Sequence, residues 1–132
     1  MKKRFLLLLA PLLMAIQCEE DPYFGTEYGI QNNSSYDLII IFEEAGEVLI
    51  ESQSYQYISK NSNSNSFTPP SEANGFNEIR LYREDGDGNL FLTYEQNPIL
   101  DNLWTPEPDP YTPISGPGYF YYKLIITDDL LE

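Results

Sequence analysis

The sequence predicts an all-β protein, an antiparallel β-sandwich of about seven short strands, and three observations support this fold class. Runs of β-branched and aromatic residues recur at short intervals, and clusters of Asn, Asp, Gly, Ser and Pro separate them. No stretch of useful length has the 3.6-residue apolar periodicity of an amphipathic helix. The 132 residues suffice for one domain of this kind.

The first 17 residues have the pattern of a secretion signal, a basic head followed by an apolar run at residues 5–16. As a helix, this run would be roughly 18 Å long, whereas the hydrocarbon core of a membrane is about 30 Å thick. Pro11 lies inside the run and weakens a permanent helix further. We therefore expect a signal-peptide helix that is removed, not a membrane span.

Cys18, the single cysteine of the chain, directly follows this segment. The residues Met14-Ala15-Ile16-Gln17-Cys18 resemble a lipobox, the site at which bacterial lipoproteins are lipidated and cleaved. Gln17 stands where the pattern prefers a small residue, a relaxed form familiar among lipoproteins of the Bacteroidetes type. The resemblance implies cleavage before Cys18 and a lipid on its sulfur, and two or more acyl chains would hold the protein stably in a membrane.

Acidic residues follow the cysteine at once, and they resemble the surface-export signal of the same group of lipoproteins. The resemblance implies an outer-membrane protein exposed at the cell surface through the signal Glu19, Glu20 and Asp21. Pro22 and Gly25 interrupt this segment, so we expect a short acidic tether. The expected divisions of the chain are a signal peptide at 1–17, a lipidated tether at 18–26 and a β-sandwich at 27–132.

The strands of the sandwich are expected where apolar and β-branched residues concentrate, at 36–43, 47–51, 54–59, 77–84, 90–95 and 119–127. A turn signal at 32–35 precedes the first of these. Residues 38–42 are apolar at every position, which predicts a central strand covered on both faces. Immunoglobulin-like and transthyretin-like sandwiches both fit such a pattern, and a small barrel is the alternative.

Two of these segments alternate clearly. Residues 77–84 place Ile79 and Leu81 on one face, and the Asp-Gly steps at 85–88 predict a hairpin to the next strand. Residues 119–127 alternate as well, and the side chains expected to face the core are Phe120, Tyr122, Leu124 and Ile126.

The composition excludes several functional classes. The chain carries a net charge of −14, and loss of the three basic residues of the signal would leave four basic against 21 acidic residues, hence −17. Such a surface repels phosphate, which argues against nucleic-acid binding. The chain has no histidine, no G-x-S-x-G motif and no carboxylate pair that the sequence singles out, so we expect no enzyme, no catalytic residue and no cofactor.

One segment has oxygen-bearing side chains at alternate positions, Asp85, Asp87 and Asn89, as at the start of a calcium-binding loop. A loop of that type needs glycine at its sixth position and glutamate at its twelfth, where this chain has Leu90 and Gln96. A plain hairpin turn explains the glycines better, so no metal site is expected.

The candidate binding residues are aromatic. Trp104, Tyr111 and Tyr119 lie in or beside an expected long loop with six prolines, 97–118, where exposed rings could stack on sugars or dock a partner. The alternative for Trp104 is that it fills the core at one end of the sandwich.

The sequence thus predicts a lipid-anchored, non-enzymatic envelope lipoprotein that acts as an interaction or accessory module. A small carbohydrate-binding module of a glycan-uptake system is the alternative. The expected partners are the membrane, through lipid on Cys18, and an envelope protein or a glycan.

Overall fold

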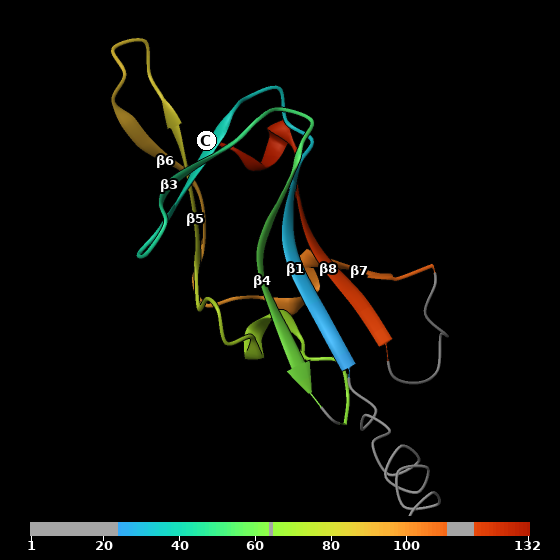
Figure 1. The fold of residues 1–132 in the computed structure, drawn as a ribbon. Helices are drawn as coiled ribbons and strands as arrows, with labels where there is room; N and C mark the ends of the chain where they lie inside the picture. Colours follow the sequence, from blue (N-terminus) through green and yellow to red (C-terminus); the bar gives the residue numbers. More distant parts are fainter. Residues whose placement is uncertain (1–23, 64, 111–117) are drawn as a thin grey trace, which may run out of the picture.

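The computed structural model describes residues 24–63, 65–110 and 118–132. The expected signal-peptide helix, Cys18, the export signal Glu19–Asp21 and Tyr111 lie outside the described residues. Within them, two four-stranded sheets form a sandwich, with strand orders β4-β1-β8-β7 (sheet A) and β3-β2-β5-β6 (sheet B) (Figure 1). The predicted all-β sandwich is confirmed, with eight strands where about seven were expected.

The four strands of sheet A are β1 (Phe24–Asn32), β4 (Tyr55–Asn63), β7 (Trp104–Pro108) and β8 (Gly118–Ile126). Those of sheet B are β2 (Leu38–Phe42), β3 (Gly46–Ile50), β5 (Ile79–Glu84) and β6 (Leu90–Gln96). The described residues contain no α-helix and three short 3₁₀ turns, η1 (Pro70–Glu72), η2 (Asp101–Leu103) and η3 (Asp128–Leu130).

Strand β1 occupies the centre of sheet A, antiparallel to β4 and parallel to β8. Alternate residues face the core, which buries Thr26, Tyr28, Ile30 and Asn32 completely or nearly so. The strand begins at Phe24, three residues before the expected start of the sandwich at residue 27. Gly25, which suggested a tether, lies in this strand.

The core lies between the two sheets. The side chains that face the core on β2 and β5, among them Leu38, Ile40, Ile79 and Leu81, pack against β1 and β8 residues. The predicted inward set of the last strand is confirmed, since Leu124 and Ile126 are fully buried and Tyr122 packs against the core.

Strand β2 lies between β3 and β5, as a central strand should. Its outer face is covered at Ile39, which is 7% exposed, but not at Ile41, which is 49% exposed. The prediction of cover on both faces is therefore wrong at Ile41, where β5 no longer runs alongside β2.

Strand β7 lies in the segment that was expected to be a proline-rich loop. It pairs with β8 alone and forms the edge of sheet A. Proline lacks the N–H that a central strand needs, but an edge strand has one side without a neighbour. Pro106 and Pro108 therefore fit within β7.

Candidate functional site

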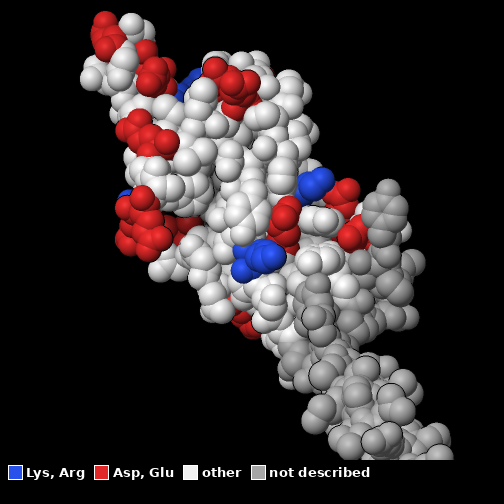
Figure 2. Space-filling model, viewed as in Figure 1, with Lys and Arg blue, Asp and Glu red and all other residues white. Residues whose placement is uncertain are grey.

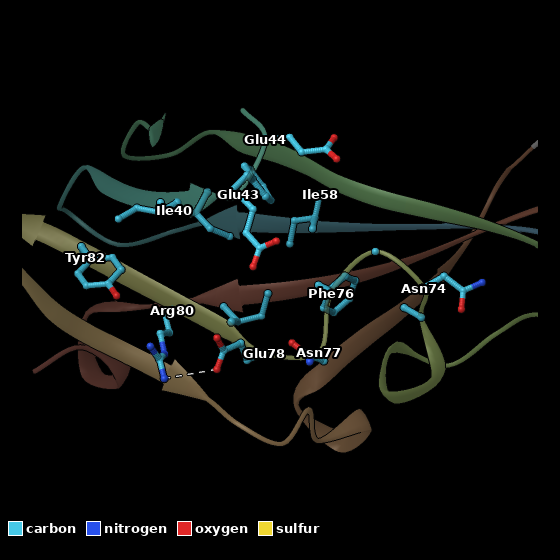
Figure 3. Close-up of a pocket in the computed structure, with 15 residues that line it drawn as sticks. Ile40, Glu43, Glu44, Ile58, Asn74, Phe76, Asn77, Glu78, Arg80 and Tyr82 are labelled. Carbon is cyan, nitrogen blue, oxygen red and sulfur yellow. Dashed lines mark ion pairs between the residues drawn. The ribbon is translucent and has the colours of Figure 1, made fainter. Parts of the chain in front are cut away.

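A large opening lies where β2 and β5 separate. The two strands pair only at Ile39 with Tyr82 and at Ile40 with Leu81, although β2 continues to Phe42 and β5 begins at Ile79. Beyond Ile40 the strands diverge, and a groove of about 850 Å³ opens between them (Figure 3). We call it the β2–β5 groove.

Apolar side chains from four segments form the walls of the β2–β5 groove: Ile40 of β2, Ile58 of β4, Phe76 of the β4–β5 connection and Ile79 of β5. Figure 3 shows Ile40 and Ile58 on one side and Phe76 on the other. On its side toward the core, the Phe76 ring stacks on Trp104, with 5.5 Å between the ring centroids. This wall is therefore part of the packed core and does not depend on a mobile side chain.

The mouth of the groove is acidic. The Glu43 carboxylate points into the groove, Glu78 lies on the opposite side, and the Glu44 carboxylate points away (Figure 3). Arg80 is the single basic residue of the lining, and its guanidinium already contacts Glu78 at 3.5 Å and Glu95 at 2.8 Å. The lining thus has an excess of negative charge.

The face of the molecule that Figure 2 shows has a related pattern. Acidic side chains gather along the side of the molecule where Figure 1 places β3, β5 and β6 (Figure 2). On the face that is turned toward the viewer, acidic and basic side chains lie next to one another. The groove, lined by residues of β2 and β5, also has acidic side chains in its lining.

Trp104 does not face solvent. Its side chain is 3% exposed, and its Nε1 donates a hydrogen bond of 2.9 Å to the Oε1 of Gln96. The register of β7 with β8 sets it opposite Leu124, on the core face of sheet A. We therefore remove Trp104 from the candidate binding residues, and its expected alternative role in the core is the one found.

Tyr119 is exposed, but it lies on the outer face of sheet A, opposite to the face that holds Trp104. There it borders a shallow hollow of about 220 Å³ with Tyr121, Lys60 and Glu27. The structure thus separates two residues that the sequence grouped together, and the third, Tyr111, lies outside the described residues.

Asp85, Asp87 and Asn89 form the turn of the β5–β6 hairpin, which confirms the predicted hairpin. The Asp85 carboxylate accepts the N–H groups of Asp87 at 2.8 Å and Asn89 at 2.9 Å, and these bonds lower its pKa. Gly88 has a φ of +81°, the left-handed conformation that glycine adopts readily. Across the described ranges, no group of three His, Cys, Asp or Glu side chains is placed to hold a metal ion.

The residues of the β2–β5 groove were not singled out by the sequence. Glu43, Ile58, Phe76 and Glu78 come from segments that are distant in the chain, and the pairing of β2 with β5 and the packing of the two sheets bring them together. The one local signal was the turn sequence after residue 42, which ends β2.

Comparisons with protein-family models, with curated proteins and with solved structures find no match to this chain. In the part of the chain that the structure describes, no helix has the length and apolar character needed to cross a membrane.

Proposed function

We propose that the protein is a lipid-anchored, non-enzymatic module of the cell envelope that binds a partner. The observation that carries the anchor is the position of Cys18, directly after a basic head and an apolar run. The observation that supports binding is the β2–β5 groove, in which Ile58 and Phe76 stay partly exposed beside acidic side chains.

The anchor implies a short distance to the membrane. The first described strand begins six residues after Cys18, and a chain of that length spans at most about 20 Å, at 3.3–3.6 Å per residue. The end of sheet A that contains Phe24 would therefore be the end nearest the lipid.

Metabolic labelling with a palmitate analogue tests the anchor. We expect the wild-type chain to be labelled and Cys18→Ser to remain unlabelled at equal abundance. The mass of the wild-type N-terminal peptide should correspond to a chain that begins at lipidated Cys18. Labelling of Cys18→Ser would rule the anchor out.

Binding is tested in intact cells with a photo-reactive amino acid. At Ile41, which is 49% exposed beside the groove, it should cross-link one defined envelope protein. Leu130 is a matched control, because it is 45% exposed and lies in η3. The same products from both positions would argue against a specific binding face.

Carbohydrate binding is the second candidate, and the hollow on sheet A favours it. Tyr119 and Tyr121 there lie beside Glu27 and Lys60, and aromatic rings beside charged side chains are suited to sugars. A glycan array with wild-type protein and Tyr119→Ala tests this function, with the exposed Tyr57 of β4 changed to alanine as the control. Sugar binding that is absent, or equal in all three proteins, would exclude this site.

A further inference from the structure

We infer that the β2–β5 groove binds an extended segment of a partner protein in which apolar and basic residues alternate, and that this segment pairs with the open edge of β2. The inference rests on the proposed binding function and adds the chemistry of the partner.

The first step concerns the backbone. The N–H and C=O groups of successive residues point alternately to the two sides of a strand. Strand β3 pairs with β2 as far as Phe42, whereas β5 pairs with it only as far as Ile40. One of Ile41 and Phe42 therefore directs its backbone groups into the groove, where an added strand could bind them.

The second step concerns the core side of the groove. Ile58 and Phe76 form partly exposed apolar walls there, in front of Ile40 and Ile79, which are 5% and 1% exposed and belong to the core. A strand added beside β2 would present every second side chain to these walls. Apolar side chains at those positions would remove the exposed parts of Ile58 and Phe76 from water, which favours binding in proportion to the apolar area buried.

The third step concerns the outer side. Glu43 lies in the turn directly after β2 and Glu78 directly before β5, and both line the groove. The intervening side chains of an added strand would point to this side. Lysine or arginine at those positions would pair with Glu43 and would share Glu78 with Arg80, whereas acidic residues would be repelled.

The charge of the groove also argues against other occupants. A second copy of this chain would bring a second set of Glu43, Glu44 and Glu78 carboxylates, and like charges oppose such a dimer. Phosphate-bearing surfaces are repelled for the same reason. A basic partner segment is the occupant that complements this lining.

The test uses the full-length protein in non-ionic detergent micelles and a labelled, end-blocked octapeptide of alternating valine and lysine. Fluorescence anisotropy at low salt should show saturable binding. Glu43→Gln and Glu78→Gln should each weaken binding roughly threefold to fivefold, the effect expected for one partly exposed ion pair.

Glu44→Gln is the matched control, because it removes the same charge from the adjacent residue, whose carboxylate points away from the groove. Glu44→Gln should change the affinity for the peptide less than twofold, because this carboxylate forms no ion pair with the peptide. Equal weakening by all three variants would mean that the peptide responds only to net charge, and the inference would be wrong.

Two further peptides test the alternation and the backbone pairing. A peptide with four valines followed by four lysines has the same composition without the alternation, and it should bind at least threefold more weakly. Two N-methylated peptides are possible, one methylated at its odd-numbered amides and one at its even-numbered amides. Because only one of these sets faces β2, one peptide should lose binding and the other should keep it. Equal binding by all peptides would overturn the inference.

The amide resonances of Ile41, Phe42 and Glu43 should shift on peptide binding, and those of the β5–β6 turn should not. If the octapeptide fails to bind while the photo-reactive residue at Ile41 still captures one partner, the proposed binding function stands and the inference about partner chemistry fails. If neither result is obtained, both fail.

Discussion

The indole Nε1 of Trp104 and the side-chain Oε1 of Gln96 are joined by a hydrogen bond of 2.9 Å, and both side chains are buried. The same oxygen accepts the N–H of Leu100 at 2.9 Å, and Gln96 Nε2 donates to the hydroxyl of Tyr94. Since Trp104 begins β7 and Gln96 ends β6, this bond joins sheet A to sheet B.

Gln96→Leu should therefore destabilise the protein by about 1–3 kcal/mol, because the indole N–H and the N–H of Leu100 lose their acceptor. Urea unfolding followed by tryptophan fluorescence measures this loss. Glu95→Gln on the same strand, with an exposed carboxylate, is the control and should change the stability by less than about 1 kcal/mol. If Gln96→Leu left the free energy of unfolding unchanged, the buried hydrogen bond would contribute nothing to stability.

Asn32 is a second buried link between the sheets. Its Nδ2 donates to the carbonyl oxygens of Tyr36 at 2.8 Å and Ile50 at 3.0 Å, and its Oδ1 accepts the Ser34 hydroxyl at 2.6 Å. Asn32→Ala should cost about 2–4 kcal/mol, because several buried groups lose a partner together. The control is Asn33→Ala, an exposed neighbour, and thermal unfolding should place its melting temperature close to that of the wild type.

The ring of Tyr55 lies over Gly29 and leaves no space for a side chain at that position. A Cβ at position 29 would lie 2.0 Å from the Tyr55 hydroxyl oxygen, so Gly29→Ala must displace the ring and break its 2.9 Å hydrogen bond to Glu27. We expect a loss of about 1 kcal/mol in stability that largely disappears in a Tyr55→Ala background. Denaturant titration of the four members of this double-mutant cycle measures the coupling. Additive effects would show that the two residues do not depend on each other.

Asp85 should make the stability depend on pH. Its pKa is lowered in the folded state by the backbone N–H groups of Asn89 and Asp87. Its contribution is therefore complete above the pKa of the unfolded chain, near 4, and is lost as the pH falls through the lower folded value. The melting temperature of Asp85→Asn should lie below that of the wild type at pH 6, and the difference should shrink below about pH 4. Asp87→Asn, the same charge change in the same turn, is the control.

Calcium should leave the melting temperature unchanged at millimolar concentration. The sixth and twelfth positions of the candidate loop are Leu90 and Gln96, both in strand β6, and the Gln96 side chain is held by Trp104. These positions therefore provide no glycine turn and no bidentate carboxylate. A rise in melting temperature with calcium but not with magnesium would contradict this expectation.

Much of the fold was predictable because six strands have a plain apolar or alternating pattern. Strands β1 and β7 were not, for opposite physical reasons. In β1, Gly25 and Gly29 face outward at the centre of a sheet, and the space above Gly29 is filled by Tyr55, a contact that local pattern does not encode. In β7, the prolines are tolerated because the strand is an edge, and edge position is a property of the assembled sheet.

The candidate site could not be predicted for a related reason. The β2–β5 groove exists because two strands stop pairing after Ile40, and the number of residues over which strands pair is not visible in either strand alone. For Trp104 the sequence left two roles open, an exposed binding residue or a core residue, and the register with Leu124 turns it inward. Tyr119 was expected to be exposed and is.

The position of β1 has a mechanical consequence. It is held by β4 on one side and by β8 along its whole length from Phe24 to Asn32 on the other. If the chain is tethered ahead of Phe24, a pull from a bound partner at the groove would load both ladders along the strand direction. The hydrogen bonds of such ladders share the load and do not open one after another, so the domain should resist extraction far better than its modest size suggests.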